Sequence, residues 1–106
     1  VYLGRDPASG RALAIKTMAL ASEFSGASLD EARRRFFREA ETAGRLRHPD
    51  IVEIVEAGED DGLAWIAMER LRGHDLSAHT LPDRLLPPEE AVAVVARVAE
   101  ALAHAH

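Results

Sequence analysis

Short apolar segments that alternate with polar residues occupy much of the first two thirds of the chain and predict β-strands. Residues 1–4 and 12–18 flank Asp-Pro-Ala-Ser-Gly, a cluster of turn formers typical of a hairpin connection. Residues 51–57 and 63–71 flank Glu-Asp-Asp-Gly, which is a second hairpin turn. The pattern therefore predicts two antiparallel hairpins.

A helical pattern separates the two hairpins. Ser28 lies three residues before Glu31, which is the spacing of a capping box at a helix start. A helix is therefore expected over residues 29–47. It should end before Pro49, because the residue that precedes a proline is pushed out of helical geometry. A short helix is expected to begin at Asp75.

The last helix is expected to begin at Pro-Pro-Glu-Glu, residues 87–90, because proline suits the first turn and carboxylates suit its positive dipole end. Four apolar side chains at helical spacing follow: Val92, Val95, Val98 and Leu102. The pattern continues to residue 106 without the Gly, Asn or Pro that commonly ends a helix, and the chain begins without Met. Both ends are expected to continue in a longer protein.

Composition and charge narrow the class of protein. The chain of 106 residues is 47% hydrophobic and 29% charged, which fits one soluble domain at most. Its net charge of -5 argues against a nucleic-acid partner. No apolar run approaches the roughly 20 residues of a membrane helix, so no membrane contact is expected from this segment. The absence of cysteine is compatible with the cytoplasm, where we expect the protein.

A lysine in the strand at residues 12–18 suggests chemistry. Leu13 and Ile15 point to one face, while Ala12, Ala14 and Lys16 point to the other, because side chains alternate along a strand. The two alanines leave room for a flat ligand beside the ammonium group. The alternative is an edge strand whose lysine lies in solvent, and the strand alone favours that alternative.

A carboxylate lies within the predicted buried stripe of the helix at residues 29–47. At about 100° per residue, the apolar side chains of this helix fall in a narrow sector centred near Glu39. These side chains are Ala32, Phe36, Ala43 and Leu46. An ionised carboxylate there requires a partner. Spacing alone makes Lys16 and Arg35, one helical turn earlier, equally good partners.

Short motifs along the whole chain resemble those of protein kinases, in the same order and at compatible spacings. Ala-Ile-Lys at residues 14–16 resembles the strand-three lysine motif, and Phe-Arg-Glu-Ala at residues 37–40 resembles the helix-C segment with its glutamate. The other matches are residues 48–52 (before strand four), 68–71 (gatekeeper and hinge), 73–76 (linker to helix D) and 101–106 (end of helix E). The chain thus resembles bacterial, eukaryotic-like serine/threonine protein kinases.

The resemblance implies an α+β fold, in which a kinase-like N-lobe of antiparallel sheet plus helix C precedes the first helices of the C-lobe. Residues 1–71 would form the N-lobe and hinge, and residues 72–106 the start of the C-lobe. Residues 1–106 would thus be a partial protein kinase domain. The implied activity is ATP-dependent phosphoryl transfer to serine or threonine of a protein substrate, with Mg²⁺ as the metal.

The resemblance also implies a role for each matched residue. Lys16 would bind the α- and β-phosphates, and Glu39 would fix its orientation. The backbone of Glu69 and Leu71 would bind adenine. Met68 would close the back of the pocket, and Val1 and Ala14 would pack on the upper face of the adenine ring. Asp75 would approach the ribose or the substrate.

The sequence contains neither His-Arg-Asp nor Asp-Phe-Gly, so it offers no candidate base and no principal Mg²⁺ ligand. The glycine-rich loop would precede Val1, and the metal ligands would follow residue 106, so none is assigned here. The chain as given is expected not to catalyse. Two other functions stay open: a pseudokinase that acts as a regulatory interaction module, and a kinase-like phosphotransferase for small molecules.

Overall fold

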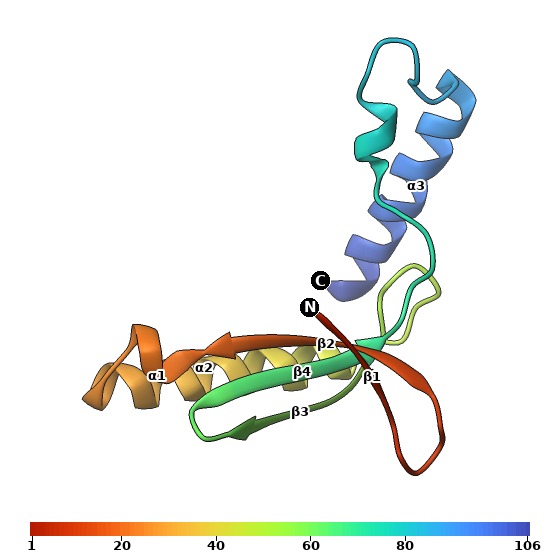
Figure 1. Cartoon of the computed structure of the whole chain (residues 1–106). Helices are drawn as coiled ribbons and strands as arrows, with labels where there is room; N and C mark the ends of the chain where they lie inside the picture. Colours follow the sequence, from red (N-terminus) through yellow and green to blue (C-terminus); the bar gives the residue numbers. More distant parts are fainter. The chain divides into compact units, whose positions relative to one another are not determined.

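The fold was obtained as a computed structural model that describes all residues from 1 to 106, and its contacts divide the chain into two units (Figure 1). The first unit comprises Val1–Arg47 and Val52–Leu71, and the second comprises His48–Ile51 and Arg72–His106. The short segment His48–Ile51 therefore belongs with the C-terminal residues, although it lies between two elements of the first unit in the sequence. No helix has both the length and the apolar character that a membrane span requires.

The first unit is built on a four-stranded antiparallel sheet with one long helix. Its strands are β1 (Tyr2–Arg5), β2 (Ala12–Ala19), β3 (Ile54–Asp60) and β4 (Leu63–Glu69), in the order β1-β2-β4-β3. Both predicted hairpins and the α+β class are confirmed. The third strand begins at Ile54 instead of residue 51, because the amide of Ile51 donates to the carbonyl of His48 and closes a turn there.

The connection between β3 and β4 is tighter than expected. Glu59 and Asp60 belong to β3, so only Asp61 and Gly62 lie between the strands. Both have positive φ, 50° and 78°. This is the backbone of a two-residue type I′ turn, whose twist matches the flanking strands and which favours Asp-Gly.

Helix α2 (Gly26–Gly44) follows a four-residue helix, α1 (Leu20–Glu23), which the sequence pattern did not indicate. The predicted capping box at Ser28 is wrong. The amide of Leu29 donates to the carbonyl of Ser25 at 3.4 Å, so helical hydrogen bonding starts earlier and Ser25 is the N-cap. The helix also ends three residues before residue 47, where hydrogen bonds of the i to i+3 type tighten its last turn.

The face that α2 turns to the sheet differs from the predicted stripe. Ala40 is the buried residue of the helix, and Phe36 and Phe37 beside it are half-buried. The stripe is thus centred near Ala40, about 100° around the helix from Glu39. The prediction omitted Phe37 and so placed the centre one residue too early.

The second unit contains the single-turn helix η1 (Leu76–His79) and the long helix α3 (Pro88–Ala105). Both were expected, and α3 begins at the predicted proline. The segment His48–Ile51 packs on α3: the rings of His48 and His104 lie 5.2 Å apart. In addition, Nε of Arg97 donates to Oδ2 of Asp50 at 3.0 Å.

This ion pair predicts an acid-sensitive contact. The hydrogen bond from Arg97 lowers the pKa of Asp50 below its usual value. Because the folded-state pKa is lowered, the ion pair stabilises the folded protein at pH values above the unfolded pKa of the carboxyl group, about 3.9. This stabilisation is lost as the pH falls through the folded-state pKa. We expect the protection of the α3 amides, relative to the intrinsic exchange rate at each pH, to fall below about pH 4, and more in the wild type than in Asp50→Asn. Identical pH profiles for the two proteins would contradict this.

Candidate functional site

Lys16 lies on the face of the sheet that α2 covers. Arg33 of α2 bonds the carboxylate of Glu59 in β3 at 2.8 Å, which identifies that face. Glu59 is opposite Ala64 in β4, and Ala64 is opposite Met18 in β2. Since side chains alternate along a strand, Lys16 and Ala14 point to the same side as Met18. Lys16 is therefore on the side from which a helix-borne carboxylate can reach it.

The neighbours of Lys16 on this face are apolar. Ala14 is directly opposite Leu3 on one side and Met68 on the other, and Lys16 is directly opposite Ile66. The ammonium group thus borders a surface of small and aliphatic side chains. Leu3, which is directly opposite Ala14, was not among the predicted site residues. The alternation that was applied to residues 12–18 would also have indicated it.

The Lys16–Glu39 pair is not formed in this structure. Glu39 accepts a hydrogen bond from Nε of Arg35 at 3.1 Å, and its side chain is 68% exposed. No carboxylate oxygen lies within 4 Å of the Lys16 ammonium group. The expectation of a buried Glu39 is wrong, because the helix turns Ala40 to the sheet. Of the two partners that spacing allowed, Arg35 is the one observed.

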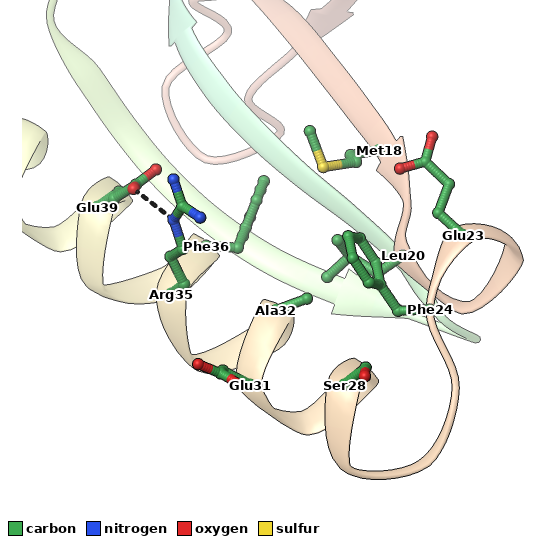
Figure 2. Close-up of a pocket in the computed structure, with 10 residues that line it drawn as sticks. All are labelled: Met18, Leu20, Glu23, Phe24, Ser28, Glu31, Ala32, Arg35, Phe36 and Glu39. Atoms are coloured by element: carbon green, nitrogen blue, oxygen red, sulfur yellow. Dashed lines mark hydrogen bonds and ion pairs between the residues drawn. The ribbon is translucent and has the colours of Figure 1, made fainter.

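A hollow of about 490 Å³ borders both the Arg35–Glu39 pair and the strand that carries Lys16 (Figure 2). Its apolar walls are Met18, Leu20, Phe24, Ala32 and Phe36. Met18 is two residues from Lys16 on the same face of β2. The space between the N-terminal half of α2 and the end of β2 is thus incompletely filled, which leaves room for the helix to shift.

The segment after β4 has the polar groups expected of a hinge. Met68 is the last strand residue but one, and Glu69 ends the strand. Leu71 is 66% exposed, and neither its amide nor its carbonyl takes part in a hydrogen bond within the chain. A ligand with one donor and one acceptor on the same edge can therefore bind this backbone without displacing an existing bond.

The two remaining predicted positions are Val1, in the first unit, and Asp75, in the second. Val1 precedes β1 and is exposed. Asp75 belongs to the second unit and caps η1: its Oδ1 accepts from the amide of Ser77 at 2.9 Å and from the Ser77 hydroxyl. These hydrogen bonds lower the pKa of Asp75, and the bond from the Ser77 hydroxyl has the largest effect. Its Oδ2 accepts no hydrogen bond within the chain and is available to a hydroxyl.

The residues of the first unit fit ATP on chemical grounds. Leu3, Ala14 and Met68 offer an apolar surface to a flat base, Leu71 offers backbone groups to its edge, and Lys16 offers one cation to phosphates. Lys16 is also the only lysine among the 13 lysine and arginine residues of the chain. That count was available from the sequence and would have strengthened the case for Lys16.

Comparison with known proteins identifies the family of the chain. The family model described as protein kinase domain matches residues 1–106. The chain is 43% identical over 111 residues to the serine/threonine-protein kinase PknI of Mycobacterium tuberculosis, and 39% identical over 106 residues to PrkC of Bacillus subtilis. These matches cover 100% of this chain but 18% and 16% of the two relatives.

Solved structures give the same result. The crystal structure of the M. tuberculosis PknI kinase domain matches 99% of this chain with a TM-score of 0.79 at 42% sequence identity. The match covers 41% of that kinase domain. Because the family model spans every residue, the chain belongs to the protein kinase family, and it matches part of a solved kinase domain.

Proposed function

We propose that this chain is the nucleotide-binding part of a serine/threonine protein kinase, which transfers the γ-phosphoryl group of MgATP to a protein hydroxyl. Protein kinases in general use ATP and Mg²⁺. The observation that carries the proposal is the position of the only lysine, Lys16, beside Ala14 and Met68 on the face of the sheet that α2 covers. The names of the relatives, all serine/threonine-protein kinases, support the substrate class.

Each residue of the site has a task in this function. The ammonium group of Lys16 holds the α- and β-phosphates, which fixes the direction of the γ-phosphoryl group. Leu3, Ala14 and Met68 hold the base, and the backbone of Glu69 and Leu71 bonds its edge. Mg²⁺, when bound, neutralises charge on the phosphates, and no residue of this chain is assigned to it.

Glu39 is proposed as the switch of this site. Its carboxylate bonds Arg35 at present, and a rotation of α2 towards the hollow would bring it to Lys16. Two packed arrangements of one helix are a common basis for switching. The exposed Arg35–Glu39 bond is easily exchanged, because surface ion pairs contribute about 0–1 kcal/mol.

The proposal also covers partners and location. A protein substrate is expected, and nucleic acid is not, in view of the net charge of -5. We place the protein in the cytoplasm.

Nucleotide titration of the isolated chain tests this function. We expect MgATP to shift the amide resonance of Leu71 and the side-chain resonance of Lys16 in a saturable manner. We also expect no phosphate transfer to the chain or to a generic protein substrate, because its sequence contains neither His-Arg-Asp nor Asp-Phe-Gly. MgATP shifts confined to other residues, or metal-dependent transfer that Lys16→Met abolishes, would overturn the corresponding half of the proposal.

A further inference from the structure

Two glutamates form a reciprocal pair: Glu53, directly before β3, and Glu69, the last residue of β4. The backbone amide of Glu69 donates to the carbonyl of Glu53 at 2.9 Å. In return, the amide of Glu53 donates to Oε1 of the Glu69 side chain, also at 2.9 Å. Both residues are half-buried. The carboxylate of Glu69 therefore completes a hydrogen-bonded pair that two backbones normally complete alone.

The backbone explains why a side chain takes this place. The register of β3 against β4 shifts between Ile54 and Glu56, and β3 begins only at Ile54. Glu53 thus lies beyond the regular ladder. In a regular hydrogen-bonded pair its amide would donate to the backbone carbonyl of Glu69. Here the Glu69 carboxylate accepts the hydrogen bond from the Glu53 amide, so the backbone carbonyl of Glu69 does not accept it.

A third residue holds Glu53 from the other side. The guanidinium group of Arg11, which directly precedes β2, lies 3.7 Å from the Glu53 carboxylate. β2 pairs with β4 up to Leu13 and Glu69. Glu53 therefore has a partner on each side: Arg11, directly before β2, and Glu69, the last residue of β4.

We propose that the Glu69 carboxylate is a positioning group that keeps the backbone carbonyl of its own residue available for the exocyclic amine of adenine. This inference rests on the proposed function. Adenine presents an amine at that edge, whereas guanine presents a carbonyl oxygen, which cannot donate. The side chain of Glu69 thus contributes to the selection of ATP over GTP, although it does not touch the nucleotide.

Replacement of Glu69 by leucine removes the acceptor at similar size. The amide of Glu53 then turns to the Glu69 carbonyl, the only acceptor left on that side. ATP affinity is expected to fall about tenfold, the value of one hydrogen bond, while GTP affinity stays constant. Glu69→Gln keeps an oxygen at Oε1 and is expected to recover most of the loss. Glu69→Ala replaces Glu69→Leu if the latter does not fold.

The experiment is an NMR titration of the whole chain with MgATP and with MgGTP, followed at the amide of Leu71. Exchange of the Glu53 amide without nucleotide reports on the hydrogen bond itself. It should be slow in the wild type and in Glu69→Gln, and its resonance should move to a new position in Glu69→Leu. A selective loss of ATP affinity in Glu69→Leu, together with that move, supports the assignment.

Two results overturn the proposal in different ways. In the first, the wild type binds ATP, and Glu69→Leu lowers the affinities for ATP and GTP equally or leaves both unchanged. The role of Glu69 is then refuted and the proposed function stands. If the wild type binds neither nucleotide at Leu71, both the proposed function and the role of Glu69 fail.

Discussion

Gly58→Val is expected to destabilise the first unit by about 2–3 kcal/mol, the cost of forcing extra volume into a packed position. Gly58 in β3 is directly opposite Trp65 in β4. A Cβ atom at Gly58 would lie 2.4 Å from Cζ2 of the indole and 2.7 Å from Cε2, so the ring has to leave its place. The better strand propensity of valine recovers at most about 1 kcal/mol. The unfolding midpoint should fall by roughly 10 °C or more.

Thermal unfolding followed by far-UV circular dichroism measures this effect, with Gly44→Ala as the matched control. Gly44 is the last residue of α2, and a Cβ atom there meets nothing within 4 Å. Alanine is the better helix former, so Gly44→Ala should leave the midpoint unchanged or raise it. Adding Trp65→Leu to Gly58→Val should recover part of the loss, because the pair is coupled. An unchanged midpoint in Gly58→Val would refute the close contact.

The isolated chain is expected to self-associate through α3. Four apolar side chains along this helix are 51% to 69% exposed: Val92, Val95, Val98 and Leu102. Burial of one such side chain contributes about 1.5–3 kcal/mol. The stabilisation lost because these side chains stay exposed is therefore comparable to the free energy of unfolding of a small domain, about 5 kcal/mol at the lower end. A second copy of the same stripe is the nearest apolar cover in a pure solution.

Sedimentation velocity over a range of concentrations tests the role of α3. Val95→Glu places a charge in the stripe and should shift the chain to monomer. Ala96→Glu adds the same charge at the next exposed position, about 100° around the helix, and should leave association unchanged. A wild-type monomer at all concentrations, with slow amide exchange over residues 89–106, would show that the stripe is covered within the chain.

The elements of the fold were largely predictable because their signals are local. Asp61-Gly62 specifies a two-residue turn because both residues adopt positive φ, and the segment Pro-Pro-Glu-Glu at residues 87–90 specifies the start of α3. The start of α2 was misjudged, because a strong Ser28–Glu31 spacing lies inside a helix that begins at Gly26. The boundary depended on the backbone carbonyl of Ser25, which no side-chain pattern shows.

The places of the predicted site residues in the sheet were predictable, but the partner of Glu39 was not. Lys16, Ala14 and Met68 follow from alternation and strand pairing. The choice of Arg35 over Lys16 as the partner of Glu39 depends on the rotation of α2, which turns Ala40 and not Glu39 to the sheet. The contact of Gly58 with Trp65 and the bond from Glu53 to the Glu69 side chain require cross-strand register.

The central claim is that the ammonium group of Lys16 faces the phosphates of bound ATP, and the single lysine permits a direct test. An acyl phosphate of ATP transfers its acyl group to an amine held beside the phosphates, with ATP as the leaving group. Only Lys16 and the terminal amine of Val1 can react as amines, and peptide mass spectrometry separates them.

The measurement compares the ATP acyl phosphate with acetyl phosphate, which lacks the nucleoside. We predict that the nucleotide reagent acylates Lys16 much faster than acetyl phosphate does, and that added MgATP suppresses the reaction at Lys16. Equal rates for the two reagents, with no protection by MgATP, would contradict the placement of Lys16 at the phosphates.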